Sequence, residues 1–164
     1  MASGWAELRE QQRQIAAADP HAGLAIAIDI GDRYDIHPSN KQELGRRLAR
    51  AARRVVFGES IAPSGPQVVE ARAMGARVVL SFADVTGQLL ALNSDYAIGF
   101  ELCGVDQPSC RFVTARPSAT RVELDATAVP SATRVRYCWA DSPVCTLYDE
   151  ARLPAGPFEI ELHR

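Results

Sequence analysis

The stretch GLAIAIDI, residues 23–30, decides how the first third of the chain is interpreted, because apolar residues occupy both of its potential faces without alternation. This pattern is typical of a strand inside a parallel sheet that helices cover on both sides. A single such strand has two unpaired edges and cannot form a sheet alone. We therefore expect residues 1–58 to be the closing helix-strand-helix portion of a larger α/β domain whose other strands lie outside this chain.

Helices are expected on both sides of this strand. Residues 3–18 carry a sparse apolar stripe, with Ser3 as the cap. The second helix follows Ser39 and Gln42, which can form a capping box, and it closes near Gly58. Its apolar face is expected to contain Leu44, Leu48, Ala51, Ala52 and Val55. We interpret the arginines opposite as a solvated surface: Arg46, Arg47, Arg50, Arg53 and Arg54. Nucleic-acid binding, the alternative, needs aromatic or base-reading partners, and none are interleaved.

From about residue 61 the apolar pattern has a period of two. Short β-rich runs are separated by turn-prone segments: ARVVLSF (76–82), AIGFELC (97–103), CRFVTAR (110–116), TRVELDA (120–126), TRVRYCW (133–139) and PFEIELH (157–163). Such a series predicts an antiparallel sandwich. The fold class is therefore an α/β piece followed by an all-β antiparallel sandwich. Its expected parts are residues 1–58, a linker at 59–66 that is rich in Gly, Pro and Ser, and the sandwich at 67–164.

Composition and charge exclude few classes. The chain has 164 residues, of which 47% are apolar and 23% charged, with a formal net charge of −2. That balance gives no global field for nucleic acid or an anionic membrane, and no apolar run approaches the roughly 20 residues of a membrane span.

The four cysteines form two pairs with the same spacing, Cys103 with Cys110 and Cys138 with Cys145. Disulfides within each pair would imply an oxidising compartment; free buried thiols and a metal site are the alternatives.

The loop after the expected strand contains DIHP, residues 35–38. In open α/β sheets, ligands collect at the carboxyl ends of strands, where this loop lies. Asp35 and His37 are two residues apart, so an extended backbone directs both side chains to the same side, and Pro38 restricts His37 to extended conformations. Asp35 could then hold one imidazole nitrogen while the other acts as a base. The alternative is a turn with an exposed histidine. A metal site of Asp29, Asp32, Asp35 and His37 is the weaker third interpretation.

Two long segments resemble one known family. Residues 23–52, GLAIAIDIGDRYDIHPSNKQELGRRLARAA, and residues 136–158, RYCWADSPVCTLYDEARLPAGPF, resemble in order the last block and the closing segment of the sialate O-acetylesterase family of SGNH hydrolases. The resemblance implies the carboxy-terminal part of a carbohydrate O-acetylesterase: the end of the SGNH-type parallel-sheet domain, then a β-sandwich. It implies an acetylated carbohydrate substrate, no cofactor, no metal, and a periplasmic or secreted location.

The resemblance also implies the roles of the site residues. In this family a serine attacks the ester, a histidine moves its proton and an aspartate orients the histidine; His37 matches the base and Asp35 its orienter. Many SGNH enzymes place the acid three residues before the histidine, where this chain has Tyr34, so Asp32 is the alternative orienter. Nothing before Ala22 resembles the blocks that hold the nucleophile. We therefore expect the serine to come from an N-terminal part of the same enzyme or a partner chain, and the chain alone to be inactive.

Ser60 and the aromatic residues of the second half allow other interpretations. The segment GES, residues 58–60, is similar to a G-D-S nucleophile motif but follows a helix, so we expect Ser60 to be a linker residue. Trp139, Tyr137 and Tyr148 could form a sugar platform, although a place in the core is favoured for Trp139. A glycan-binding or purely structural sandwich with a docking arm is thus the alternative to an enzyme part, without nucleic-acid or membrane partners.

Overall fold

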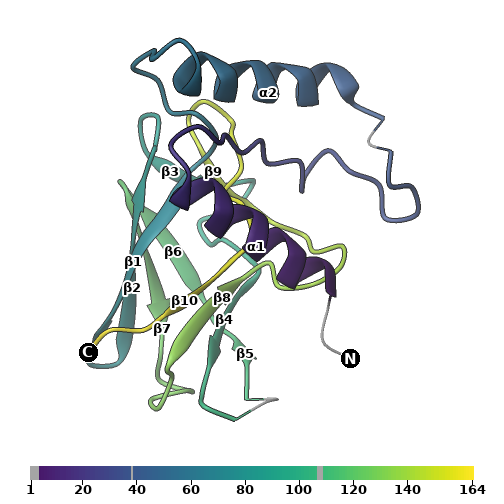
Figure 1. Cartoon of the computed structure of the whole chain (residues 1–164). Helices are drawn as coiled ribbons and strands as arrows, with labels where there is room; N and C mark the ends of the chain where they lie inside the picture. The colour runs from purple at the N-terminus through teal and green to yellow at the C-terminus, as the bar shows by residue number, and fades with distance from the viewer. Residues whose placement is uncertain (1–3, 38, 107–108) are drawn as a thin grey trace.

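A computed structural model describes residues 4–37, 39–106 and 109–164 of the chain (Figure 1). Two helices come first, α1 (Gly4–Ala18) and α2 (Lys41–Val55). The strands that follow are β1 (Gln67–Met74), β2 (Arg77–Ala83), β3 (Leu89–Ala91), β4 (Phe100–Cys103), β5 (Arg111–Phe112), β6 (Ala115–Ser118), β7 (Arg121–Asp125), β8 (Arg134–Tyr137), β9 (Leu147–Asp149) and β10 (Phe158–Glu161). Among the described residues, no helix is long and apolar enough to cross a membrane.

The strands form two four-stranded antiparallel sheets, in the orders β1-β2-β7-β6 and β10-β8-β4-β5, and a two-stranded sheet of β3 and β9. Every run with a period of two contains a strand, because alternation gives each strand one apolar face to bury. The arrangement is consistent with the expected β-sandwich. Three strands, β1, β3 and β9, lie outside the six runs. β3 and β9 have only three residues each, and the bulge in β1 interrupts its alternation.

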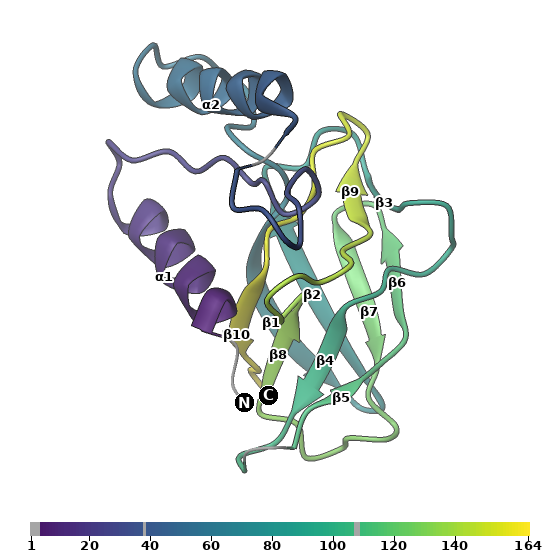
Figure 2. The ribbon, with the colours of Figure 1, turned by 90° about the vertical axis from the view of Figure 1, so that its right-hand side faces the viewer.

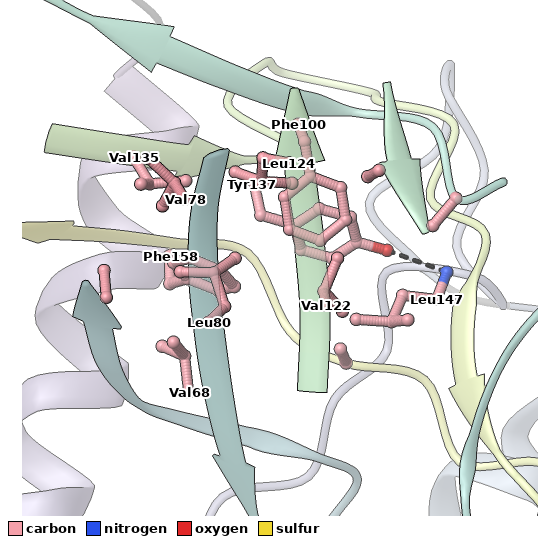
Figure 3. Close-up of a cluster of buried hydrophobic side chains, with 14 of the residues drawn as sticks. Val68, Val78, Leu80, Phe100, Val122, Leu124, Val135, Tyr137, Leu147 and Phe158 are labelled. Atoms are coloured by element: carbon pink, nitrogen blue, oxygen red, sulfur yellow. Dashed lines mark hydrogen bonds between the residues drawn. The ribbon is translucent and has the colours of Figure 1, made fainter. Parts of the chain in front are cut away.

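The core lies between the two four-stranded sheets (Figure 3). Leu80 and Val122 come from one sheet and Phe100, Tyr137 and Phe158 from the other, and all five are at most 1% exposed. The Phe100 and Tyr137 rings lie 4.4 Å apart between centroids. The tyrosine hydroxyl accepts a hydrogen bond from the main-chain nitrogen of Leu147 at 3.0 Å, so its one polar atom is satisfied inside the core.

Both cysteine pairs are disulfides. Cys103 is bonded to Cys110 and Cys138 to Cys145, each closing a short loop next to a strand of the same sheet. The first bridge lies between β4 and β5, and the second holds the loop that follows β8. Of the three alternatives that the sequence left open, the within-pair disulfide is the one the structure has.

The expected strand at residues 23–30 does not form in this chain by itself. Among the described residues no strand pairs with this segment, which is irregular and ends in a turn where Ile30 N donates to Ala27 O at 3.2 Å. A strand needs a neighbour for its backbone groups, and the described part of the chain supplies none beside it. The segment instead packs on the end of the sandwich, and Ile26 and Ile28 are the side chains that contact it.

The helix boundaries are close to those expected, but one cap differs. Ser3 and Pro38, to which the sequence assigned a capping and a restricting role, lie outside the described residues. Asn40 rather than Ser39 caps α2, since its Oδ1 accepts from Glu43 N at 3.1 Å. The last turn is followed by Gly58, which has a φ of 66° and so suits the left-handed conformation that stops a helix.

The arginine face of α2 is not uniformly solvated, which corrects a second expectation. Arg47 is buried, and Arg50 Nε donates to Ala62 O at 2.6 Å. Leu48, expected on the apolar face, is 53% exposed. The helix is therefore rotated from the orientation that its apolar residues suggested. The ion pair of Arg47 with Asp29, whose side chain is 15% exposed, accounts for this rotation, and only the tertiary structure supplies that partner.

Both helices belong to an arm, residues 4–58, that lies against the sandwich (Figure 2). α1 runs beside β10, with Ala6 fully buried. Glu10 is only 5% exposed and accepts hydrogen bonds from Arg13, from Gln14 and from the main-chain nitrogen of Glu159 on β10. Figure 2 shows α2 beyond the end of the sandwich, so the loop between the helices is held above that end.

Candidate active site

An ion pair closes the base of the loop that carries DIHP. The Arg47 guanidinium donates to Asp29 Oδ1 at 2.6 Å and Oδ2 at 2.9 Å, to Ile26 O at 2.7 Å and to Glu43 Oε1 at 3.1 Å. The side chains of Arg47 and Asp29 are 6% and 15% exposed. Burial lowers the pKa of Arg47, but its hydrogen bonds and charge interactions with Asp29 and then Glu43 outweigh that effect and raise it. We call this cluster, with Tyr148, the latch.

Tyr148 connects the latch to the sandwich. This residue lies on β9, is 9% exposed and has its hydroxyl hydrogen-bonded to the Asp29 carboxylate. Burial raises the pKa of Tyr148 to about 12, and the negative charge of Asp29 adds to this shift. The latch therefore joins Asp29, before the loop, to Arg47, after it, and both to β9, which restrains the described loop residues 30–37 and 39–40.

Asp35 and His37 meet in that loop. One carboxylate oxygen, Asp35 Oδ1, accepts from the His37 main-chain nitrogen at 2.8 Å and lies 2.8 Å from His37 Nδ1. The backbone hydrogen bond and then the side-chain hydrogen bond from His37 lower the pKa of Asp35, so it is a carboxylate at neutral pH. With its proton on Nδ1, the imidazole has a free lone pair on Nε2, which is the arrangement a general base requires.

The pair of Asp35 and His37, called the dyad below, is exposed, and Asp35 lies at the rim of a large cavity. The side chains of His37 and Asp35 are 75% and 59% exposed. Asp35 lines a hollow of about 1010 Å³ between α1, residues 24–36 and the loop at residues 140–142. Its lining includes unusually exposed apolar side chains: Trp5 at 52%, Leu8 at 46%, Tyr34 at 91% and Ile36 at 79%. Such a concentration of apolar surface is the mark of an interface or a ligand groove.

The other residues that the sequence singled out have different partners. Asp32 Oδ1 accepts from Tyr34 N at 2.7 Å and so stabilises a turn, whereas the carboxylate that reaches His37 belongs to Asp35. Asp29 is engaged by Arg47. Among the described residues, no group of three His, Cys, Asp or Glu side chains could hold a metal ion. Ser60 is exposed in the segment between α2 and β1 and does not follow a strand.

Several important residues were missed or misjudged from the sequence. The sequence predicts Arg47 to be one of five solvated arginines, but it is buried. Asp149, to which the sequence assigns no role, is fully buried and accepts from Thr86 N and Leu153 N at 3.0 Å each. The sequence favours Trp139 as a core residue, but it is half-buried beside a second cavity, with Arg136 Cζ 4.7 Å from its ring. Tyr137 is the aromatic of that cluster that enters the core, because β8 faces Tyr137 inward and ends before Trp139.

Comparison with known proteins agrees with the resemblance in the sequence. The chain is 28% identical over 153 residues to a sialate O-acetylesterase from Pongo abelii, and 28% identical over 160 residues to the sialate O-acetylesterase of Mus musculus. These matches cover 85% and 88% of this chain but 29% of either relative. A crystal structure of a carbohydrate acetylesterase from Xanthomonas citri superposes with a TM-score of 0.88 at 38% identity, covering 96% of this chain and 36% of that one. A scan of protein-family models gives no match.

The sandwich, the arm and these matches together identify the class of protein. The chain is related to the carbohydrate acetylesterases, which are hydrolases. More particularly, it is related to the sialate O-acetylesterase family and matches the carboxy-terminal part. The chain spans less than a third of the length of the curated relatives that it matches. The relatives support an esterase-related role.

Proposed function

We propose that the chain is the carboxy-terminal part of a serine-type carbohydrate O-acetylesterase and supplies two of its three triad residues, His37 and Asp35. The observation that carries the proposal is the 2.8 Å contact between Asp35 Oδ1 and His37 Nδ1, within a segment that resembles the family's last block. In this role Asp35 fixes the tautomer and orientation of the imidazole, and Nε2 faces the reaction.

The reaction needs an alcohol that an N-terminal part of the enzyme supplies. The serine oxygen attacks the acetyl carbonyl while His37 Nε2 takes its proton; the imidazolium then gives this proton to the sugar oxygen as its bond to the acetyl carbon breaks, and the sugar leaves with a hydroxyl group. Water attacks the acetyl-enzyme with the same histidine as base, and acetate leaves. The chain by itself turns over little or no ester, because its own residues do not include a serine in the family's nucleophile position.

The N-terminal part docks on the arm in this proposal. Residues 1–58 are then the end of an SGNH-type parallel-sheet domain, residues 59–66 the linker and residues 67–164 the sandwich domain. The apolar segment 23–30, which pairs with no strand among the described residues, gains a neighbour in the sheet of that part. The exposed apolar side chains around the 1010 Å³ cavity become buried in the same step. The two disulfides favour a periplasmic or secreted enzyme.

A chimaera tests the proposal. The amino-terminal portion of the Xanthomonas citri acetylesterase is joined to this chain in place of its own matching segment, and hydrolysis of p-nitrophenyl acetate is measured. We expect activity, a loss of roughly 10³-fold or more in kcat for His37→Ala, and a loss of roughly 10²- to 10⁴-fold for Asp35→Asn.

The matched control is His21→Ala, another exposed histidine of the arm that lies outside the dyad, and it should leave turnover unchanged. Equal turnover in His37→Ala and the unsubstituted chimaera refutes the triad assignment. Serine-dependent ester hydrolysis by the purified 164-residue chain refutes the view that the nucleophile comes from elsewhere.

A further inference from the structure

The outer face of the sheet β10-β8-β4-β5 carries a row of side chains that the dyad does not use. Neighbouring strands pair Glu159 with Arg136, Arg136 with Glu101, and Glu101 with Phe112. The residues on either side of Glu101, Phe100 and Leu102, are fully buried, so the row points away from the core. Side chains paired in this way lie side by side across the strands, and the row therefore forms one continuous surface.

The two ends of the row differ. At β10, α1 covers the sheet, and Glu159 binds both Arg136 Nε at 2.5 Å and Arg134 Nε at 3.2 Å. At β4 and β5 the row opens into a cavity of about 830 Å³. Its lining includes three aromatic side chains and one carboxylate: Tyr96, Phe112, Trp139 and Glu101.

Two aromatic rings of this cavity, Tyr96 and Trp139, are held in place, and a third, Phe112, is openly accessible. Phe112 is 77% exposed and Tyr96 41% exposed. Arg116 fixes Tyr96, because its guanidinium carbon lies 4.7 Å from the ring centroid and its Nη2 donates to the hydroxyl at 2.5 Å. Arg136 lies against Trp139 in the same way, 4.7 Å from the ring centroid, and the disulfide between Cys138 and Cys145 holds the loop that bears the tryptophan. Rings fixed before binding lose little entropy when a ligand stacks on them.

Glu101 gives the cavity its polar group. It is half-buried, and among the described residues its carboxylate has no hydrogen-bond donor. Burial raises the pKa of Glu101, while the nearby charge of Arg136 opposes that shift. A half-buried carboxylate without a donor is ready to accept hydrogen bonds from hydroxyl groups of a ligand, and it repels a ligand carboxylate.

We propose that this cavity binds a neutral oligosaccharide, whose pyranose rings stack on Trp139 and Phe112 while sugar hydroxyls donate to Glu101. Apolar ring faces combined with several hydroxyl donors are the chemistry that aromatic rings and one acceptor match. An anionic sugar is disfavoured, because Arg136, the arginine of the row, is already paired with Glu159 and is not free to bind a ligand carboxylate.

The position of the cavity links it to the candidate active site. Ala140 lines both hollows, and the loop from Trp139 to Val144 separates them. A glycan seated in the second cavity can therefore extend across this loop towards the hollow at whose rim Asp35 lies. This link to catalysis rests on the proposed function, but the binding itself does not.

Calorimetric titration of the full 164-residue chain tests the inference with cellohexaose, xylohexaose and 3′-sialyllactose as probes. We expect saturable binding of at least one neutral probe and weaker binding of the sialylated one. Phe112→Ala and Trp139→Ala should each weaken the neutral complex by about tenfold or more. Glu101→Gln should reduce the preference for the neutral probe, because it removes the charge that repels the carboxylate.

Val69→Ala is the matched control, since Val69 is an apolar residue of β1 in the other sheet and is 57% exposed; it should bind as the unsubstituted chain does. Phe112 is so exposed that its truncation leaves the core intact, which keeps the test valid if Trp139→Ala fails to fold. Binding that is absent for both neutral probes, unchanged in Phe112→Ala, or stronger for the sialylated probe overturns the inference. The chimaera can be inactive while this binding persists, so the two proposals fail separately.

Discussion

Replacing Arg47 with methionine should loosen the whole arm, because this side chain holds the ends of the dyad loop together. The change keeps a similar apolar stem but removes four hydrogen bonds, including both to Asp29; it leaves that carboxylate without its cationic partner and Ile26 O without its donor. Breaking a fully buried ion pair lowers the free energy of unfolding by about 3–5 kcal/mol. The partial exposure of Asp29 and Glu43 reduces this effect, so we expect a loss of about 2–4 kcal/mol for Arg47→Met.

The matched control is Arg46→Met on the same helix. The Arg46 side chain is 66% exposed, and its Nη1 lies 3.5 Å from Glu43 Oε2. Exposed pairs of this kind contribute about 0–1 kcal/mol to stability. Urea unfolding followed by circular dichroism gives the free energies, and amide hydrogen exchange shows where protection is lost. We expect faster exchange in residues 23–30 and 41–55 of the Arg47 variant and little change in the strands of the sandwich.

A double-mutant cycle then isolates the pair. Asp29→Asn combined with Arg47→Met should cost at least about 1 kcal/mol less than the sum of the single changes, because the second change removes the charge that the first left unpaired. If Arg47→Met and Arg46→Met give the same unfolding free energy and the same exchange, the latch does not hold the arm and our account of the loop is wrong.

Three further changes test the remaining contacts. Glu10→Ala should lower the free energy of unfolding by roughly 1–3 kcal/mol, because it leaves Glu159 N without its acceptor at the α1–β10 contact. Amide hydrogen exchange in α1 should become faster, and unchanged exchange contradicts this prediction. Stability should fall as pH rises from about 10 through about 12, since the unfolded chain ionises Tyr148 first, and Tyr148→Phe should flatten that fall and remove a phenol transition near pH 12 from the absorbance titration. Replacing Cys138 and Cys145 together with serine should lower the free energy of unfolding by about 2 kcal/mol, the loop-closure value for so short a loop, and an unchanged urea midpoint argues against it.

The sequence predicts the sandwich well and the arm less well, and the reason is physical. A period of two in residues 76–82 or 120–126 records burial of one strand face, and both strands form where they are expected. Residues 23–30 satisfy a different local criterion, that of a strand apolar on both faces, but a strand also needs a neighbour, and that requirement is not local. The disulfide pairing could be anticipated only as one of three alternatives, since spacing alone does not decide between a thiol and a bridge.

The candidate site divides in the same way. Asp35 and His37 can be paired from their spacing, because two residues in one short loop meet through local geometry. Arg47 cannot, since nothing in the helix distinguishes it from Arg46: both belong to an arginine-rich face, and only the approach of Asp29 from 18 positions earlier buries one of them. A charged residue that is buried through a distant partner leaves no periodic signal.

The exposure of the dyad bears on how catalysis could be completed. A hydrogen-bonded pair whose two side chains are 75% and 59% exposed competes with water and fixes the imidazole only moderately. In the proposed enzyme, a partner that covers the cavity beside the pair would remove that water, strengthen the contact between Asp35 and His37, and bring the substrate ester to Nε2 in the same event. The latch would keep the loop in position before that event, and the docked N-terminal part would then supply both the nucleophile and the low-dielectric surroundings in which the pair acts.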